Sequence, residues 1–277
     1  MNANVRFLWE SIYSDAATLE ASAFVEGWPV INLQHPLTAL AWKCPDGTGF
    51  VKNSFDEPRM VSALALIGHN LGIGSTVTIR VYDDAFLTEI FSQTFDVIKP
   101  VYTAGEILPC NSSPLGYPSA EDLAVLPRTT SVFFLDKTFC QRCLKVEINN
   151  GATAFHVGRM ILCKHFEPQN NFSYGWRDSP SDDSTVTRAL GGQDWVDDKA
   201  RRCGYSFSLG SLSKGEVDGP LKKMRNHCGR SRPLVVVLDP DNPIANHAVY
   251  CKFKMVPAVT QPQHGIYTAN FNIEEAL

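Results

Sequence analysis

Three cysteines and a histidine have residue types and spacing that could bind a metal ion. Cys140 and Cys143 stand at C-x2-C spacing, and Cys163 and His165 follow further along the chain. Structural zinc takes four such thiolate and imidazole ligands in a tetrahedron. However, residues three apart on one strand point to opposite faces of a sheet, so the first pair needs a turn or bulge to converge. We therefore expect buried, reduced thiols and predict no metal site, with zinc at these four residues as the open alternative.

His69 and Asn70 follow an apolar run and precede two glycines, a place where a catalytic histidine can occur. No serine, cysteine or carboxylate stands out as a partner for His69. A lone His or Asn at such a place commonly caps a turn by bonding backbone groups. The Gly72–Gly74 pair leads into a strand, whereas a phosphate cradle needs a helix N-terminus. We expect a structural turn and predict no cofactor and no cofactor-binding residue.

Two pairs of adjacent carboxylates, Asp182-Asp183 and Asp197-Asp198, lie on polar stretches that are typical of solvated loops. The two carboxylates of a glycosidase can be far apart in sequence, so such an enzyme stays a less favoured alternative. The chain contains no motif of a serine hydrolase, a zinc protease, a P-loop protein or a kinase. The sequence predicts no catalytic residue and a protein that is not an enzyme.

A basic run near the C-terminal third has no aromatic residues between its charges. Its members are Lys222, Lys223, Arg225, Arg230 and Arg232. The whole chain has a net charge of −4, which argues against a phosphate backbone as the main partner. We expect a solvated helix face or salt bridges between subunits, and no binding of nucleic acid.

Composition points to a folded protein with a partly covered surface. Charged residues make up 19% of the 277 residues, against about 25% in a typical globular protein. Such a charge-poor surface suggests coverage by other subunits. No apolar run approaches the ~20 residues that span a bilayer. The first residues lack an apolar segment, so we expect no signal peptide and read the 8 cysteines as reduced thiols in a cytoplasm.

Most periodic segments alternate apolar and polar residues, which is the pattern of a half-buried strand. We predict strands at 63–67, 77–81, 90–95, 132–135, 144–148, 155–161, 205–209, 234–238, 249–255 and 267–273. Asn150-Gly151 lies between two of these runs, and Asn-Gly favours the type I′ turn of a β-hairpin. The sequence therefore predicts that strands 144–148 and 155–161 pair with each other.

Helix signals are few. A short turn or helix is expected within residues 14–24. A second helix is predicted from an N-cap at Asp218 to Gly229, because Gly215, Gly219 and Pro220 weaken the alternative start at Ser213. Ser213 and Glu216 nevertheless fit a capping box.

The chain is predicted to contain two domains. Residues 99–128 are rich in proline, which blocks both a helix and a central strand, so they form a long excursion from the sheet. Residues 169–184 are polar. We expect a β-sandwich at 1–168 with the insertion 99–128, followed by a smaller β-rich unit at 169–277.

Several short runs together resemble tail proteins of bacteriophages and prophages. The runs are Asn32-Leu33, Trp42, 63–71, 75–81, 191–197, 205–209, 232–237 and 273–276. The N-terminal part of such proteins is similar to discoidin or galactose-binding-like sandwiches. The resemblance implies a mainly β chain, with a jelly-roll or discoidin-like sandwich followed by a smaller β-rich tail-assembly unit with one short helix.

The resemblance also implies a role. The expected protein is a structural component of a virion tail, near the tail tip or baseplate, which assembles in the host cytoplasm with other tail proteins. Copies of the chain are expected to form a ring. The first alternative is a module that binds a host-surface glycan through exposed aromatics, with Trp9, Trp28, Trp42, Trp176 and Trp195 as candidates. The second is a glycan-degrading tail hydrolase.

Overall fold

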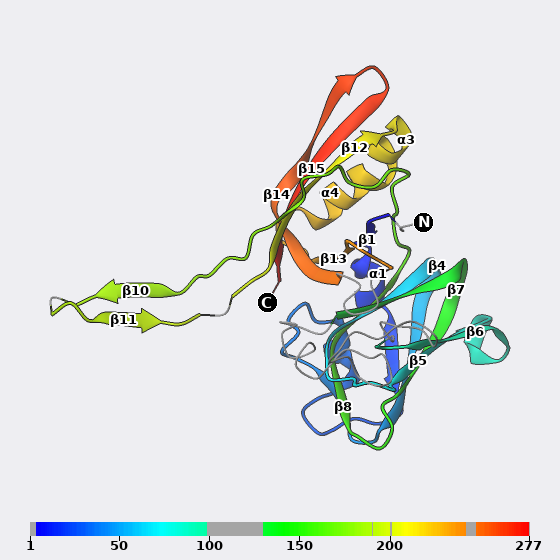
Figure 1. Cartoon of the computed structure of the whole chain (residues 1–277). Coiled ribbons are helices and arrows are strands. Elements are labelled where there is room, and N and C mark those ends of the chain that lie inside the picture. Colours follow the sequence, from blue (N-terminus) through cyan, green and yellow to red (C-terminus); the bar gives the residue numbers. More distant parts are fainter. Residues whose placement is uncertain (1–3, 99–129, 190, 200, 242–247, 277) are drawn as a thin grey trace, which may run out of the picture. The chain divides into compact units, whose positions relative to one another are not determined.

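The chain is mainly β and folds into two units, shown in Figure 1 for a computed structural model. The structure describes residues 4–98, 130–189, 191–199, 201–241 and 248–276. The first unit contains residues 1–167 and 235–249, and the second contains 168–234 and 250–277. The predicted fold class, a β-sandwich followed by a smaller β-rich unit with a helix, is confirmed. The predicted insertion 99–128 lies outside the described residues.

The first unit holds most of the strands. Its elements are β1 (Arg6–Leu8), α1 (Ser11–Asp15), β2 (Thr18–Ala21), the 3-10 turn η1 (Val30–Gln34), β3 (Trp42–Cys44), β4 (Thr48–His69), β5 (Thr76–Tyr82), the 3-10 turn η2 (Asp84–Phe86), β6 (Glu89–Asp96), β7 (Thr130–Asn149), β8 (Phe155–Cys163) and most of β13 (Leu234–Val237). Strands β3, β8, β4, β7, β5 and β6 lie side by side in that order, and β2 pairs with β4.

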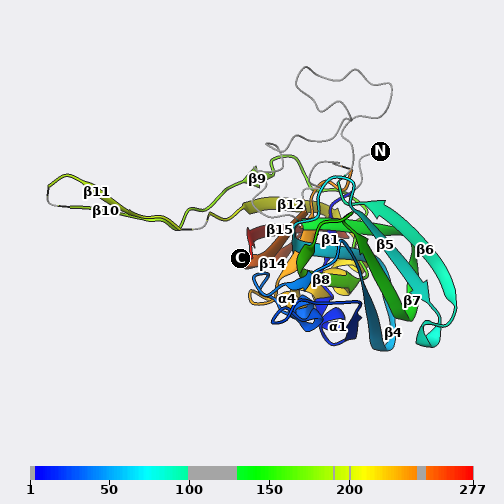
Figure 2. The same cartoon turned by 90° about the horizontal axis from the view of Figure 1, so that it is seen from below.

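Two long strands, β4 and β7, build the sandwich because each takes part in both of its halves. Residues 51–54 of β4 pair with β2, whereas residues 63–69 pair with β8. The register with β7 shifts between Ser54 and Arg59, and such an irregularity bends a strand. Residues 143–149 of β7 continue the sheet into β5 and β6, whose curvature Figure 2 shows.

One cluster of buried side chains fills the sandwich. Leu64 and Leu66 of β4 belong to the same cluster as Ile79 of β5 and Val146 of β7. Full burial of each such side chain stabilises the fold by about 1.5–3 kcal/mol. In β5 and β7, the alternation that predicted the strands therefore marks the side chains that face this buried cluster.

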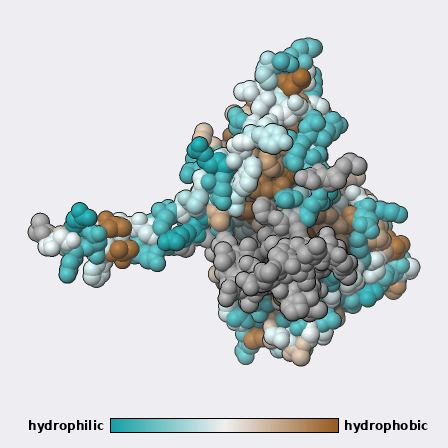
Figure 3. Space-filling model, in the orientation of Figure 1, coloured by the Kyte–Doolittle hydropathy of each residue, from teal (hydrophilic) through white to brown (hydrophobic). Residues whose placement is uncertain are grey.

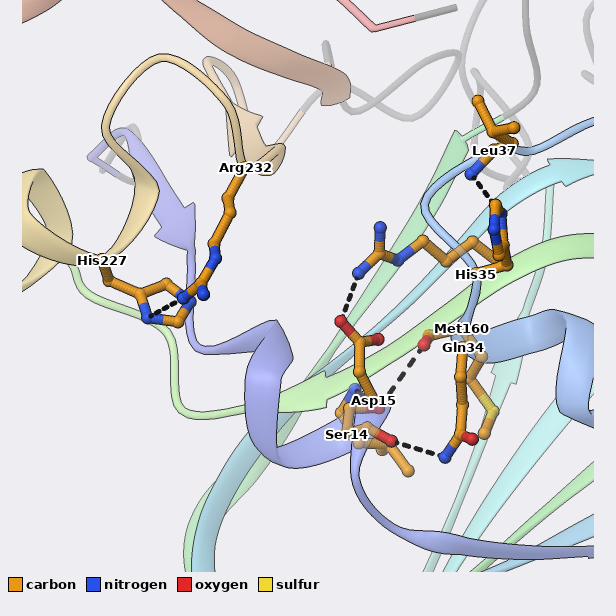
Figure 4. Close-up of polar contacts among 10 residues, drawn as sticks. Ser14, Asp15, Gln34, His35, Leu37, Met160, His227 and Arg232 are labelled. Atoms are coloured by element: carbon orange, nitrogen blue, oxygen red, sulfur yellow. Dashed lines mark hydrogen bonds and ion pairs between the residues drawn. The ribbon is translucent and has the colours of Figure 1, made fainter.

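Helix α1 covers part of β8 that has no strand neighbour on that side in the described residues. The Ser14 hydroxyl donates to the Met160 carbonyl at 3.4 Å and accepts the Leu162 backbone N–H at 3.3 Å. A carboxylate oxygen of Asp15 lies 2.7 Å from the guanidinium of Arg159, which is buried (Figure 4). Breaking a buried ion pair leaves an uncompensated charge, so this contact fixes where α1 lies.

The Asn150-Gly151 turn does not form the predicted hairpin. Strand β8 pairs with β4 and β3, and β7 pairs with β4 and β5, so β4 separates the two strands that the turn joins. Gly151 does adopt a positive φ of 68°. The Asn150 side chain accepts hydrogen bonds from the Gly72 backbone and the Ser75 hydroxyl. The turn thus connects two strands that both pair with β4, and the predicted pairing of strands 144–148 and 155–161 with each other was wrong.

The second unit is a smaller sheet with one longer helix. Its elements are β9 (Arg177–Asp178), β10 (Thr185–Arg188), β11 (Asp194–Asp197), β12 (Gly204–Leu212), α3 (Lys214–Glu216), the π-turn η3 (Val217–Leu221), α4 (Lys222–Cys228), most of β14 (Ala248–Gln263) and β15 (Ile266–Glu275). Strands β14, β15, β12 and β9 lie side by side in that order. The rings of Phe207 and Phe271 stack with centroids 5.0 Å apart in its core.

The helix of the second unit begins earlier than predicted. Ser213 is its N-cap, and the capping box with Glu216 is complete: each side chain accepts the other residue's backbone N–H. The helix continues to Cys228 through the π-turn, which contains Pro220. The predicted start at Asp218 was wrong because a π-turn accommodates a proline that would break a regular helix. The expected turn within 14–24 is also displaced, since α1 ends at Asp15 and β2 follows.

Candidate functional site

The four residues considered as alternative zinc ligands differ in their burial and surroundings. Cys140 is exposed and Cys143 is buried, as expected for residues three apart on one strand. Cys163 is buried and pairs with Ala63 of β4. Among the described residues no group of three or more His, Cys, Asp or Glu side chains could hold a metal ion. The structure thus gives no support to zinc at these residues.

His165 instead belongs to a polar cluster that the sequence did not reveal. Its Nδ1 lies 2.7 Å from the Ser62 hydroxyl, and its Nε2 lies 3.9 Å from a carboxylate oxygen of Glu167. Glu167 also accepts a hydrogen bond from the Arg6 guanidinium at 2.8 Å. Burial lowers the pKa of His165, and the Arg6 charge adds to this effect.

These three residue types form a catalytic triad in serine hydrolases, but the geometry here is structural. Ser62 is buried, and its oxygen already accepts the His165 backbone N–H at 3.0 Å. A nucleophile must reach a substrate carbonyl, which a buried hydroxyl that already makes two hydrogen bonds cannot do. The cluster ties β4 to the segment that follows β8.

His69 and Asn70 cap a turn, as predicted. The Nδ1 of His69 accepts the Leu71 backbone N–H at 3.3 Å, so its Nε2 carries the proton that it shares with the Ser131 hydroxyl at 3.0 Å. The side-chain oxygen Oδ1 of Asn70 accepts the His156 backbone N–H at 2.8 Å. Burial, with the His156 charge adding to it, lowers the pKa of His69 to about 4. A neutral, buried imidazole with both nitrogens engaged serves the fold.

The five tryptophans divide into buried and exposed groups. Trp42 is fully buried and Trp9 nearly so, and the ring of Trp28 has the Lys43 ammonium 3.6 Å from its centroid. Trp176 is 44% exposed and Trp195 is 77% exposed. Of the five candidates for ligand stacking, these last two present their rings to solvent.

Trp195 lies on a two-stranded ribbon that we call the arm, residues 182–202 with 190 and 200 outside the described residues. Its strands β10 and β11 pair with each other, with Val186 opposite Val196 and Thr187 opposite Trp195. Every described residue of both strands is exposed. Figure 3 shows the apolar residues of this ribbon at its surface. An isolated two-stranded hairpin is marginally stable in water.

Most charges of the arm are paired with one another. Four ion pairs lie within it: Arg188–Asp194 at 3.0 Å, Arg201–Asp182 at 3.2 Å, Arg202–Asp183 at 3.6 Å and Lys199–Asp197 at 3.7 Å. The Asp198 carboxylate accepts the Ser184 hydroxyl. The two carboxylate pairs therefore contact other residues of the arm. Its other exposed side chains are both apolar and polar: Val186, Trp195 and Val196, and Thr185, Thr187 and Gln193.

The basic run forms the exposed side of α4 and the residues after it. Lys222 and Lys223 are exposed, whereas Met224 and Cys228 on the same helix are buried. Arg232 lies 3.4 Å from the His227 ring (Figure 4). The placement agrees with the predicted solvated helix face.

A second apolar surface lies between β2 and β3. Residues 22–40, which we call the apolar loop, contain a single formal charge, at Glu26. Large apolar side chains in it are exposed: Phe24, Val25, Ile31, Leu37 and Leu40. The backbone is held locally, for example by the Val25 N–H on the Lys43 carbonyl and by the Asn32 side chain on the Ala41 carbonyl. A held segment with this much exposed apolar surface is typical of an interaction site.

None of the helices in the described part of the chain is long and apolar enough to cross a membrane.

Neither a family model nor a curated protein matches the chain. Solved structures do match. The lectin binding domain of Lectinolysin in complex with Lewis b is 13% identical, covers 55% of this chain and 94% of its own, and has a TM-score of 0.36. Chitosan-binding module 1 of a chitosanase/glucanase from Paenibacillus sp. IK-5 is 10% identical, covers 58% and 98%, and has a TM-score of 0.37. A Streptococcus pneumoniae fucose binding module is 11% identical, covers 54% and 94%, and has a TM-score of 0.34.

These matches cover about half of the chain. They concern the fold, and what those modules bind is a property of those modules.

Proposed function

We propose that this protein is a structural subunit that acts by assembling with other protein subunits, and that the arm makes one of the contacts. The observation that carries this proposal is the ribbon of β10 and β11, in which Val186, Trp195 and Val196 are exposed. Charged residues beside them form ion pairs with one another within the ribbon. Burial of such side chains against a partner releases about 25 cal/mol per Å² of apolar surface.

The finer identity within this proposal is a component of a bacteriophage tail, near the tip or baseplate. Its support is the resemblance of short runs such as 63–71 and 191–197 to phage tail proteins. The second of these runs lies in the arm. In this proposal the chain folds in the host cytoplasm, assembles into a virion with other tail proteins and catalyses no reaction.

The test is the oligomeric state of the protein with and without the arm. Thr185 and Asp197 are opposite each other in the ribbon, so residues 186–196 can be replaced by Asn-Gly, which closes a two-residue hairpin. We expect the wild-type protein to form oligomers in native mass spectrometry and light scattering, and the short-arm variant to be monomeric with an unchanged circular dichroism spectrum. Lys223→Ala, on the solvated face of α4, is the matched control and should assemble normally.

A wild-type protein that stays monomeric to about 100 µM, well above the Kd of a specific protein contact, would contradict self-assembly through the arm. Normal oligomers from the short-arm variant would exclude the arm as the contact.

Glycan binding is the second candidate, because two exposed aromatic residues directly precede the edge strand β9. Tyr174 is fully exposed, and Trp176 lies beside Tyr205 with ring centroids 6.1 Å apart. Burial, with the Cys203 thiol and Asp178 adding to it, raises the pKa of Tyr205 to about 12, so its hydroxyl keeps its proton at neutral pH. Aromatic faces next to hydrogen-bonding groups are typical of small-molecule sites.

A glycan array would test this candidate directly. Binding that is lost in Trp176→Ala and kept in Trp195→Ala would support a glycan site at β9. An array without hits for the wild-type protein would remove it.

A further inference from the structure

Strand β6 is an open edge of the β-sandwich. Among the described residues it pairs with β5 and with no other strand, and Figure 2 shows it at the outer end of the sheet, beyond β5. Proteins commonly protect such an edge with a proline, a lysine or a β-bulge, because an unprotected edge can accept a strand from another chain. Over residues 91–96, β6 has none of these features.

The hydrogen bonds between β5 and β6 determine which groups of the edge are free. The Val97 N–H donates to the Ser75 carbonyl at 3.0 Å, and residues 91–96 pair with β5 without a register shift. Hydrogen-bonded and non-hydrogen-bonded positions alternate along an antiparallel pair. Residues 91, 93 and 95 therefore bond to β5, whereas the backbone N–H and C=O groups of Ser92 and Thr94 point away from the sheet.

The side chains of β6 indicate what an added strand should carry. Phe91 and Phe95 lie half-buried on the inner face, with ring centroids 4.6 Å from Phe139 and 5.4 Å from Phe133 of β7. A strand beside β6 would place every second side chain next to the open sides of these two rings. Such a strand should therefore be apolar at alternate positions.

Charge indicates the residues between the apolar ones. Residues 76–96, the hairpin of β5 and β6, contain four acidic residues against one arginine, a net charge of −3. Arg80 is already paired with Glu89 at 2.7 Å and Glu147 at 3.0 Å. Asp96 is exposed and belongs to none of the ion pairs between described residues. Lysine or arginine in the added strand would complement this edge.

The same charges disfavour a second copy of the chain as the added strand. Antiparallel pairing of two β6 strands would bring Glu89 of each copy towards Asp96 of the other. Like charges across two strands are destabilising.

We propose that β6 binds an extended segment of a partner protein, which joins the sheet as a further strand and alternates apolar with basic residues. Backbone hydrogen bonds to the edge supply affinity in such a contact, and alternate side chains supply specificity. The contact uses neither the arm nor β9, so it goes beyond the assembly proposed above.

A library of random peptides of about 12 residues, long enough for a strand, is the probe, displayed on phage and selected on the full chain. Enriched peptides should alternate apolar and basic residues. Ser92→Pro removes one outward N–H and keeps the hydrogen bonds to β5, and Ser92→Ala is the matched control because Ser92 is exposed. The Kd of an enriched synthetic peptide, measured by fluorescence anisotropy, should rise at least about tenfold in Ser92→Pro and should not change in Ser92→Ala.

A second measurement does not depend on how the proline variant folds. N-methyl groups on alternate residues of the peptide remove the N–H groups on one of its two edges. One alternate set should abolish binding to the wild-type protein, and the other set should be tolerated, because one edge of the peptide bonds to β6. An equal effect of the two sets would contradict strand addition.

Three further outcomes would show the inference to be wrong. The first is a selection that enriches no peptide, or peptides without alternating apolar and basic residues. The second is a peptide that binds Ser92→Pro as tightly as it binds the wild type. The third is a smaller oligomer of Ser92→Pro in native mass spectrometry without any enriched peptide, because β6 would then pair with a second copy. Assembly through the arm keeps its own test, since Ser92 lies outside the arm.

Discussion

The β-sandwich and the arm are both made of antiparallel strands, yet they use the same residue types in opposite ways. In the sandwich, Trp42 is fully buried, donates its indole N–H to the Ala23 carbonyl at 3.0 Å, and meets the edge of Phe155 at 5.4 Å. In the arm, Trp195 is 77% exposed and lies opposite Thr187. Burial of Trp42 stabilises the folded chain, whereas Trp195 gains no such stabilisation within its own chain and is available to a partner in the proposed assembly.

The difference also separates two kinds of polar contact. Asp15 and Arg159 meet where one partner is buried, so their charges hold α1 against β8. Arg188 and Asp194 meet in solvent, where an ion pair contributes little to stability. Substitutions in the sandwich should therefore change the free energy of unfolding, and substitutions in the arm should change association.

The strongest contrast is expected from the two tryptophans. Trp42→Ala should lower the free energy of unfolding of the first unit by about 3–5 kcal/mol, because it leaves a cavity in a packed core. Trp195→Ala should change it by less than about 0.5 kcal/mol. Urea unfolding followed by circular dichroism measures both. If Trp42→Ala does not fold, it is replaced by the milder Trp42→Phe, which loses the hydrogen bond to Ala23. Equal effects on the free energy of unfolding at positions 42 and 195 would contradict the distinction between the two regions.

The strands of the sandwich could be predicted because burial on one face leaves a period of two in the sequence, as at Val77, Ile79 and Val81. Their partners could not be predicted in the same way. The Asn150-Gly151 turn gave a local hairpin signal, but β4 inserts between the strands on either side of it. Which strands pair depends on long-range packing that alternation along one strand does not record.

The arm and the apolar loop were missed for a related reason. Strands β10 and β11 have no buried face, so their sequences carry no alternation to detect. The low overall charge did suggest a covered surface, but the composition of a chain does not show which residues form such a surface. The position of an exposed apolar surface could be read only from the structure, in which five large apolar side chains of residues 22–40 are exposed, whereas Leu33 is buried.

A second contrast is expected from acid, which should destabilise the sandwich and spare the arm. Burial holds the pKa of His69 at about 4 in the folded chain, below the value of about 6.5 in an unfolded chain. As the pH falls from about 6.5 to 4, the unfolded chain binds a proton that the folded chain does not. The free energy of unfolding should therefore fall by up to about 3 kcal/mol over this range and then stop responding to His69.

Urea unfolding at several pH values checks this expectation. His69→Gln should be less stable at neutral pH and should show a flatter dependence between pH 6.5 and 4. An unchanged slope in that variant would mean that another group carries the pH dependence.

A smaller effect is expected at the N-cap of the helix in the second unit. Its cap is only partly buried, so its contribution to stability should lie between those of the buried sandwich core and the exposed arm. Ser213→Ala removes the hydroxyl that accepts the Glu216 backbone N–H at 3.3 Å, and should cost about 1 kcal/mol. Ser213→Thr keeps an acceptor and serves as the control. If Ser213→Ala has no effect while an N-cap substitution at Asp218 does, the helix starts where the sequence first suggested.

The smallest effect is expected in the arm. Arg188→Gln removes an ion pair whose partners are 76% and 46% exposed, and such a pair contributes little to stability. The midpoint of urea unfolding of this variant should therefore equal that of the wild type both at about 0.1 M salt and at about 1 M salt, where exposed charges are screened. The same variant leaves Asp194 unpaired beside the exposed apolar side chains of the arm, so association should weaken, though less than in the short-arm variant. A loss of stability as large as that of Ser213→Ala would show that the arm is packed within its own chain. The contrast between the two regions would then fail.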